Sequence, residues 1–342
     1  MVSKGGVTIQ DVALLAGVAV SSVSRALSNH PDVSGAMKAR VAAAAKELGY
    51  SPDPAAQSLR SGSSRTVGFM VRDYANPYFS DIILGLEETL THAGYTLLVM
   101  NSGGEASSEV ERIGLLAQRR VDALVLSSIS DVAAAARTAV KLFKRPLVLL
   151  DRDFGQLRGA AVQLDHATGL RDATTDLIEL GHKRIAMVTG SMNIRPTRER
   201  LRGYREALEE HGLPKPRALE VSGLFSADFA REATNHFLSL PAARRPTAII
   251  GGGVQPTIGV LEAFSAHGVR PGDDMSLVVC DDVPWLRVLR PTVSVVTRDG
   301  QGMGKAAAEL VLEQIAGKAP RIITLPTAYE PRETSCKPAS KA

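Results

Sequence analysis

The chain has 342 residues, of which 44% are hydrophobic and 22% are charged, and its formal net charge is +4. This composition is ordinary for a globular α/β protein and excludes fibrous and disordered classes, while the length suffices for two or three domains. No run approaches the roughly 18 apolar residues of a membrane span, and the N-terminus lacks the apolar region of a signal peptide. We therefore expect a cytoplasmic protein with no membrane partner.

The cysteines and histidines give no sign of a metal site or of catalysis. Cys280 and Cys336 are too few and too far apart for a disulfide framework or a zinc module, which fits a reducing compartment. None of the seven histidines falls into an H-E-x-x-H spacing, and no G-x-S-x-G elbow is present. We expect no metal ligands, no cofactor, no catalytic residues and no enzyme.

Residues 8–27 contain two helix-length apolar patterns joined by a short turn at residues 17–19. Thr8, with Asp11 three positions later, forms a start that resembles a capping box. The second pattern leaves one face polar and cationic, with Ser21, Ser22, Ser24 and Arg25 on it. Two short helices with a Gly-containing turn predict a helix-turn-helix, whose second helix enters a DNA major groove. The alternative is an ordinary helical hairpin.

A third helix is predicted after a turn at residues 29–32, with Ser34 as its N-cap and Gly49 at its end. Three short helices would make a small DNA-binding headpiece over residues 1–50. Residues 1–65 also carry +3 of the net charge of +4. A local basic surplus is the electrostatic footprint of a phosphate-binding surface.

Residues 51–65 are predicted to form a hinge helix and a linker. Asp53 is a good N-cap and Pro54 suits the first helical position, so a very short helix is expected from Asp53 to about Arg60. Such a helix is only marginally stable by itself. Residues 61–64, Ser-Gly-Ser-Ser, form a flexible linker that marks a domain boundary.

From residue 66 onward, apolar strand-like runs alternate with helical patterns. The predicted strands are TVGFMV, TLLVM, VDALVLS, PLVLLD, RIAMVTG, TAIIG and SLVVC. The predicted helices between them include residues 79–93, 109–118, 197–211 and 259–267. This alternation predicts two doubly wound lobes with parallel sheets, which bind ligands at the carboxyl ends of their strands.

Distinctive motifs occur along nearly the whole chain: VTIQDVALLAGVAVSSVSRALSN, VSGAMKARVAAAAKELGYSPDPAAQSLR, NPYFSDIILGLEE, LIELGHKRIAMVTG, RLRGYREAL, LVVCDDVPWLRVLRPTVSVV and PRETS. In this order they resemble the lactose-repressor/galactose-repressor family of bacterial transcription regulators. The resemblance implies an all-α headpiece, a hinge helix, and a two-lobed core over residues 66–335 like that of periplasmic binding proteins. It also implies an N-lobe of residues 66–163 and 296–323, a C-lobe of residues 164–295 and 324–335, and a tail of residues 336–342.

The resemblance implies which headpiece residues meet DNA. The first residues of the second helix, Val20, Ser21 and Ser22, would contact base edges. Phosphate contacts are implied for Thr8, Ser24, Arg25, Ser28 and Asn29. Phosphate contacts fix the register without selecting the sequence. Ala19 departs from the serine that the family usually has before this helix, so the helix lacks an N-cap hydroxyl.

The hinge helix is implied to lie in the minor groove beside that of a second protomer. Leu59 would be the wedge that unstacks the central base step, and Arg60 would also contact the DNA. Paired hinge helices and a palindromic operator require a homodimer. The alternative is that Leu59 merely packs the linker against the core.

A small effector, a sugar or a related polar metabolite, is expected between the lobes. By resemblance, Arg195 would grip a carboxylate or vicinal hydroxyls, and Asp281 would accept hydrogen bonds from the ligand. Apolar faces for stacking would come from Tyr78, Phe79 and Phe225. Weaker additions are Arg152, Asp165 and Thr197. The structural alternatives are a surface ion pair for Arg195, a loop cap for Asp281 and plain core for Phe225.

Residues 251–254, Gly-Gly-Gly-Val, depart from relatives that carry a polar pair at Gly253 and Val254. The pocket would therefore be roomier, be less polar, or use backbone amides. The sequence predicts a DNA-binding repressor whose operator affinity a small molecule modulates. The alternative is a sugar-binding transport protein with the same core, which would need a signal peptide and no headpiece.

Overall fold

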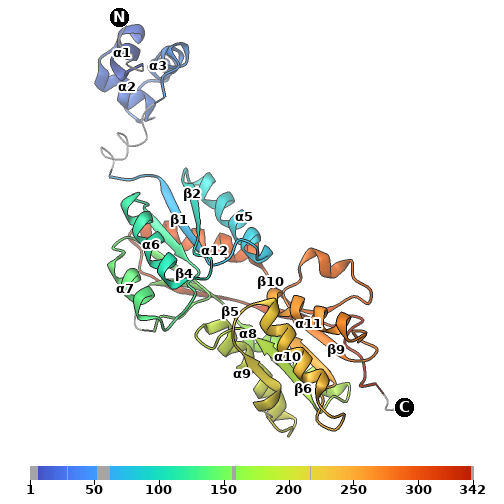
Figure 1. The fold of residues 1–342 in the computed structure, drawn as a ribbon. Helices are drawn as coiled ribbons and strands as arrows, with labels where there is room; N and C mark the ends of the chain where they lie inside the picture. Colours follow the sequence, from blue (N-terminus) through green and yellow to red (C-terminus); the bar gives the residue numbers. More distant parts are fainter. Residues whose placement is uncertain (1–6, 29, 52–61, 156–158, 216, 340–342) are drawn as a thin grey trace, which may run out of the picture. The chain divides into compact units, whose positions relative to one another are not determined.

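The computed structural model describes residues 7–28, 30–51, 62–155, 159–215 and 217–339. The chain forms two compact units, Met1–Ser64 and Arg65–Ala342, here called the headpiece and the core (Figure 1). The headpiece is helical and the core is α/β, which confirms the predicted fold class. In the described residues no single helix is long and apolar enough to cross a membrane. Only α1 and α2 reach that length together, and the chain bends by 99° between them.

The headpiece consists of α1 (Ile9–Ala16), α2 (Val20–Leu27) and α3 (Gly35–Leu48). The 99° bend between α1 and α2 is typical of a helix-turn-helix. Gly17 makes the turn possible because its φ of 64° lies in the left-handed region. The three helices share a core around Val12, Val23 and Val41, each fully buried. These features confirm the predicted turn and the predicted third helix.

Caps fix the ends of the headpiece helices, with one exception. Asp11 Oδ2 accepts hydrogen bonds from Thr8 N at 2.8 Å and from Thr8 Oγ1 at 2.7 Å. Ser34 Oγ accepts from Met37 N at 3.4 Å, and Gly49 ends α3 with a φ of 65°. The N-cap of α2 is Ala19, which offers no side-chain acceptor.

We expect Ala19→Ser to stabilise the headpiece by about 1 kcal/mol, because a serine hydroxyl would accept from a free N–H in the first turn of α2. Ser34→Ala is the matched control, since it removes the cap of α3 and should cost a similar amount. Hydrogen exchange of the α2 and α3 amides measures both effects. Faster exchange in the Ala19→Ser protein would contradict the cap assignment.

The first lobe of the core is built on a six-stranded parallel sheet in the order β2-β1-β3-β4-β5-β11. Its strands are β1 (Thr66–Val71), β2 (Thr96–Asn101), β3 (Ala123–Leu126), β4 (Leu147–Leu150), β5 (Ala160–Leu164) and β11 (Ile322–Leu325). Its helices are α5 (Pro77–His92), α6 (Ala106–Gln118), α7 (Ala134–Leu142) and α12 (Gly300–Ile315).

The second lobe has a six-stranded sheet in the order β7-β6-β8-β9-β10-β12, in which only β12 runs antiparallel to its neighbour. Its strands are β6 (Ile185–Thr189), β7 (Glu220–Ser222), β8 (Ala248–Gly251), β9 (Ser276–Cys280), β10 (Ser294–Arg298) and β12 (Thr327–Glu330). Its helices are α8 (His166–Glu179), α9 (Arg195–Glu210), α10 (Ala227–Ser239) and α11 (Val254–Ala266). Short 3₁₀ turns lie at Arg217–Leu219 and Pro284–Arg287.

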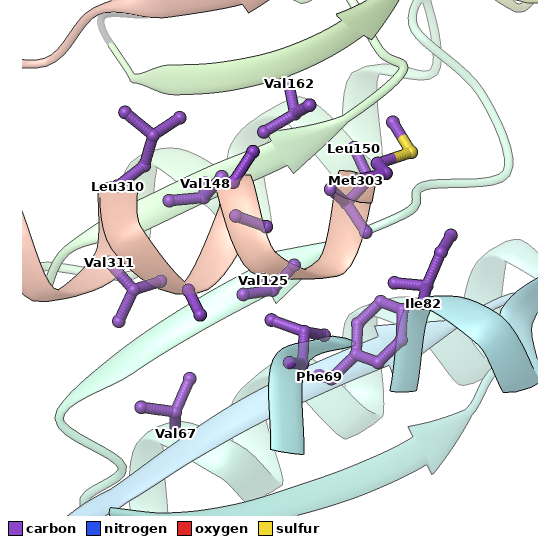
Figure 2. Packing of buried hydrophobic residues seen from close by; sticks show 14 of the residues in the cluster. Val67, Phe69, Ile82, Val125, Val148, Leu150, Val162, Met303, Leu310 and Val311 are labelled. Carbon is purple, nitrogen blue, oxygen red and sulfur yellow. The ribbon is translucent and has the colours of Figure 1, made fainter. Parts of the chain in front are cut away.

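Each sheet is covered by helices on both faces because its central strands are apolar on both sides. In β3, Ala123 and Val125 face α5 and α12, whereas Leu124 and Leu126 face α6 and α7. Figure 2 shows the first of these layers, with Met303, Leu310 and Val311 of α12 packed over the strands. The second lobe repeats this arrangement, with α10 and α11 on one face and α8 and α9 on the other.

The chain passes between the two lobes three times, after β5, after β10 and after β11. β10 belongs wholly to the second sheet, so the second crossing follows Arg298. Both cysteines are free, and Cys280 lies in the second-lobe core. Four helices, namely α5, α6, α9 and α11, begin two to five residues earlier than the sequence predicts. In α5 and α9 a proline lies at the first or second helical position, and Asn76 also caps α5, so the starts of these two helices are set by local signals other than the apolar repeat.

Candidate functional site

The N-terminus of α2 is the exposed part of the helix-turn-helix. Val20 is 41% exposed, and Ser21 is exposed beside it. The buried side chains of this helix, Val23 and Ala26, face the headpiece core. The first turn of α2 is therefore free to meet the edges of bases, the role implied for Val20, Ser21 and Ser22.

The residues implied to contact phosphates surround this turn. Thr8, Arg25 and Ser28 are exposed, and Ser24 is partly exposed. Ser28 Oγ donates to Arg25 O at 3.2 Å, so its oxygen can still accept a hydrogen bond. Asn29, Leu59 and Arg60, and the predicted hinge helix, lie outside the described residues.

The second candidate site is a cavity between the lobes, lined by residues of both. From the first lobe come the carboxyl ends of β3 and β4, the residue after β1 and the start of α5; from the second come the start of α9, Phe225 and Arg298. Carboxyl ends of parallel strands are the usual ligand side of such folds. The cavity has a volume of about 30 Å³, far below the roughly 300–1,000 Å³ of ligand pockets. In this arrangement it holds no more than a water-sized molecule.

Two wider pockets adjoin the cavity. One, of about 390 Å³, shares Arg72, Ile194 and Phe225 with it. The other, of about 650 Å³, shares Tyr78 and Arg298. The shared side chains form the dividing walls, and in each wall a guanidinium lies over an aromatic ring, Arg72 at 4.6 Å from the Phe225 centroid and Arg298 at 3.4 Å from that of Tyr78.

Four of the eight predicted effector residues line the cavity: Tyr78, Phe79, Arg152 and Phe225. Tyr78 and Phe79 occupy the first turn of α5, which Asn76 caps by accepting from Tyr78 N at 3.1 Å. Arg152 is 3% exposed and donates from Nη1 to Asp151 O at 2.8 Å. Phe225 is half-buried rather than plain core.

Arg195 does not line the cavity. Its Nη1 donates to Asp151 Oδ1 at 3.0 Å and to Leu164 O at 2.9 Å. Its backbone N–H donates to Asp131 Oδ2 at 2.5 Å. The side chain therefore joins the second lobe to the first instead of projecting towards a ligand.

Asp165, Thr197 and Asp281 also lie outside the cavity lining. Asp165 caps α8, accepting from Thr168 N at 3.2 Å and from Thr168 Oγ1 at 2.7 Å. Thr197 is buried, and its hydroxyl has no hydrogen-bond partner in the described part of the chain. Asp281 lines the 650 Å³ pocket and accepts from Arg298 Nη2 at 2.7 Å.

Three arginines of the cavity were missed by the sequence analysis: Arg72, Arg200 and Arg298. A signal for Arg200 was present, because it falls on the buried face of α9 together with Pro196, Thr197 and Leu201. A cation on an apolar helical face is costly unless it has a partner, and is therefore a candidate for function. Arg72 and Arg298 stand at the carboxyl ends of β1 and β10, positions that the strand-end rule also singles out.

The space left by the missing side chain at Gly253 is not empty. A Cβ atom at Gly253 would lie 2.5 Å from Phe225 Cζ, so the Phe225 ring occupies that volume. Val254 is 3% exposed and belongs to the second-lobe core. The backbone remains in use, since Gly252 O accepts from Arg200 Nη1 at 2.7 Å. The glycine run therefore makes room for an aromatic wall and does not enlarge the cavity.

Ion pairs join the two lobes beside the cavity. Asp131, in the loop after β3, is 1% exposed and accepts from Arg198 Nη2 at 3.0 Å as well as from Arg195 N. Asp151 pairs with Arg195 and with His166, whose Nε2 lies 2.6 Å from Asp151 Oδ2. These two carboxylates of the first lobe thus hold the starts of α8 and α9.

His166 and Asp151 have shifted pKa values. Burial lowers the pKa of His166 to about 4, although the nearby Asp151 opposes this shift. Burial alone would raise the pKa of Asp151, but His166, Arg152 and Arg195 hold it below its usual range. At neutral pH the pair is therefore a carboxylate and a neutral imidazole.

We expect stability to fall as the pH drops from 6.5 to 4, because His166 binds a proton in the unfolded chain before it does so in the folded one. The expected contribution is on the order of 2 kcal/mol. Urea unfolding at pH 7 and pH 4.5 measures it, with His166→Gln as the comparison, since glutamine can still donate to Asp151. The variant should lose less stability over this range than the natural chain. Equal losses would show that His166 does not carry the dependence.

Comparisons with known proteins agree with this architecture. Residues 8–53 match the bacterial regulatory proteins of the lacI family, and residues 174–335 match the periplasmic binding protein-like domain. The ribose operon repressor of Escherichia coli (strain K12) is 30% identical over 308 residues, which cover 90% of this chain and 93% of that repressor. The transcriptional repressor PurR of Photobacterium profundum is 29% identical over 311 residues, covering 91% and 92%.

Solved structures extend the similarity to the whole fold. The Lac repressor dimer bound to operator and the anti-inducer ONPF has a TM-score of 0.83 at 25% identity, covering 97% of this chain and 100% of that one. The transcriptional regulator CelR in complex with cellobiose has a TM-score of 0.72 at 29% identity, covering 96% and 99%. The helix-turn-helix, the two-lobed core and the relatives that match over nearly the full length all indicate one family. The chain belongs to the lacI family of bacterial transcriptional regulators.

Proposed function

We propose that this protein is an operator-binding repressor whose affinity for DNA responds to a small molecule held between the core lobes. The observation that carries the proposal is the exposed first turn of α2, set on a helix-turn-helix that precedes a two-lobed core in one chain. The Lac repressor, similar over 97% of the chain, is seen on operator DNA. A transport-type protein with the same core has no use for such a headpiece.

We propose the following division of the chain: residues 1–50 as headpiece, 51–65 as hinge and linker, and 66–335 as effector-binding core. We further propose a cytoplasmic homodimer on a palindromic operator, because two headpieces read two half-sites only when a two-fold axis relates them. Leu59 is proposed as the minor-groove wedge and Arg60 as a contact beside it. Sedimentation analysis with and without operator DNA tests the dimer.

The effector site is proposed to be the interlobe cavity, with Tyr78, Phe79, Arg152 and Phe225 as contacts. Arg72, Arg200 and Arg298 join this set because they line the same cavity. With about 30 Å³ of free volume, a sugar-sized ligand enters only if side chains or lobes move. Such a movement alters the ion pairs at Asp131 and Asp151, which gives a ligand a means of shifting the lobe arrangement. Arg195, Asp165, Thr197 and Asp281 would act through that arrangement.

The proposed regulatory function is tested by selecting binding sites from random DNA duplexes and then titrating the protein against the selected duplex. The full chain should enrich a palindromic sequence, and residues 65–342 should not bind it. Ser21→Ala should relax the preference at one base position, whereas Arg25→Gln should weaken binding to all sequences and lower the salt slope by about 1. If the truncated core bound the selected duplex as tightly as the full chain, the proposal would fail.

A further inference from the structure

The charge of the interlobe cavity is unbalanced. Its lining contains four arginines, Arg72, Arg152, Arg200 and Arg298, and a single carboxylate, that of Asp151. Two of the arginines have acidic neighbours, since Arg298 pairs with Asp281, and Arg152 Nε lies 3.8 Å from Asp131 Oδ1. Within the described ranges, no carboxylate forms an ion pair with Arg72 or Arg200. Two guanidinium groups in one cavity thus have no direct ion pair, although Asp73 lies near enough to Arg72 to act on its pKa, and Asp281 near enough to feel the charge of Arg200.

These two guanidinium groups also have free hydrogen-bonding capacity. The Nε atoms of Arg72 and Arg200 are both buried without a hydrogen-bond partner in the described structure. Arg200 is only 4% exposed, and among the residues that the structure describes its hydrogen-bond acceptor is Gly252 O. A guanidinium has five N–H groups, and a buried charged donor without an acceptor is costly. An acceptor of two or more hydrogen bonds would remove this cost.

Helix geometry adds further positive potential. α5 and α9 are both 16 residues long, and both begin at the cavity wall, with N-caps at Asn76 and Ile194. The N-terminus of a helix carries a partial positive charge that favours anions. Independently of the helices, burial and the charges of Arg152, Arg298 and Arg200 lower the pKa of Arg72 to about 9, while Asp73 opposes this shift. The cavity is therefore a site at which positive charge is disfavoured and negative charge is favoured.

The adjoining 390 Å³ pocket has a different lining. Beyond the Arg72–Phe225 wall it offers hydroxyls at Ser191 and Ser226 and the backbone of Gly103, Gly104 and Gly223, with Asp73 as its one acidic residue. Hydroxyls, a carboxylate and open backbone suit the hydroxyl groups of a polyol, whereas the arginine cavity suits an anion. Movement of the Arg72 side chain off the Phe225 ring would join the two spaces.

We propose that the effector carries a phosphate or carboxylate group that binds between Arg72 and Arg200, with its neutral, hydroxyl-bearing part in the adjoining pocket lined by Ser191 and Ser226. The inference rests on the proposed function of the cavity as the effector site, and it narrows the ligand class from sugars in general to anionic sugar derivatives. The anion would pair with the positive charges of Arg72 and Arg200 and accept hydrogen bonds from their Nε–H groups. Bidentate hydrogen bonds, which arginine forms with carboxylates and phosphates, fit this arrangement.

Inorganic phosphate is the first probe, titrated against the full chain at constant ionic strength with chloride as the balancing ion. Phosphate at ten times its Kd should raise the Tm by about 2 to 4 °C. Arg72→Gln and Arg200→Gln should each weaken phosphate binding at least tenfold, because each removes a charge that faces the anion. Arg119→Gln is the matched control, since Arg119 is exposed at the end of α6 and should leave the shift unchanged. Each shift is read against the same protein in chloride, so a change in baseline stability does not affect it.

The second measurement compares glucose, gluconate and glucose 6-phosphate, which share one carbon skeleton and differ in their charged group. Tighter binding of gluconate would show that the anionic group of the effector is a carboxylate, and tighter binding of glucose 6-phosphate that it is a phosphate. The proposal is overturned if phosphate fails to stabilise the natural chain, if the two cavity variants respond as the Arg119→Gln control does, or if glucose binds as tightly as its anionic derivatives. Operator selection by the full chain is independent of these outcomes, so the proposed regulatory function would then stand with a neutral effector.

Discussion

Replacement of Asp151 by asparagine is expected to lower the free energy of unfolding of the core by about 4 kcal/mol. Asp151 is 5% exposed. Its carboxylate accepts hydrogen bonds from Arg195 Nη1, from Leu164 N at 3.3 Å and from His166 Nε2. The substitution keeps the volume but removes the negative charge beside Arg152 and Arg195. Breaking a buried ion pair from one side leaves an uncompensated charge, which costs more than the pair itself contributes.

Asp153→Asn is the matched control for this change. Asp153 lies two positions further along the same loop and is exposed, and its Oδ1 accepts from Gly155 N at 2.7 Å. A cost below about 1 kcal/mol is expected there. Urea unfolding of both variants and of the natural chain at pH 7 gives the comparison. Similar midpoints for Asp151→Asn and Asp153→Asn would mean that the interlobe pairs around Asp151 contribute little.

The second large effect is expected from Gly85→Ala in α5. A Cβ atom at Gly85 would lie 2.2 Å from the backbone oxygen of Gln301, and Gly304 on α12 has the same relation to Ile82 O. The two helices thus cross at glycines with their backbones in contact. Since neither helix can move without disturbing the layer in Figure 2, we expect a loss of about 3 kcal/mol.

Gly114→Ala in α6 provides a control of opposite sign. A Cβ atom at Gly114 meets nothing within 4 Å, so the added methyl group should only improve helix propensity and stabilise the core by up to about 1 kcal/mol. Thermal unfolding of the two variants should therefore shift Tm in opposite directions. A Gly85→Ala protein with an unchanged Tm would rule out the close helix crossing.

Much of the fold could be predicted from the sequence because the central strands are apolar and each is followed by an amphipathic helix. The strands that were not predicted separately lie at edges or crossings: β5, β7, β10, β11 and β12. β7 has only three residues, and β11 and β12 alternate exposed and covered side chains. Such segments acquire strand structure from the partner beside them, which local pattern does not reveal.

The candidate site was only partly predictable for a related reason. Tyr78 and Phe79 at the start of α5 could be predicted because they belong to the motif NPYFSDIILGLEE. Arg195 and Arg200 lie five positions apart on α9, which is about 1.4 turns, so they face different directions. The resemblance selected Arg195, whereas the fold places Arg200 in the cavity. Likewise, the glycines at 251–253 indicated an absent side chain, but only the fold shows that Phe225, 28 positions earlier than Gly253, fills the space. Contacts between distant segments decide both cases.

The three crossings between lobes also determine the order in which the protein can fold during synthesis. The three helices of the headpiece are complete once Gly49 has been made. The first lobe begins at β1 but lacks α12 until residue 315 and β11 until residue 325. Until residue 315 has been made, Phe69, Val125 and Val148 have no complete α12 to cover them. A nascent chain therefore carries a finished DNA-binding unit ahead of a long stretch of unsatisfied apolar surface, and a message truncated before residue 300 would yield a headpiece attached to a lobe that cannot close.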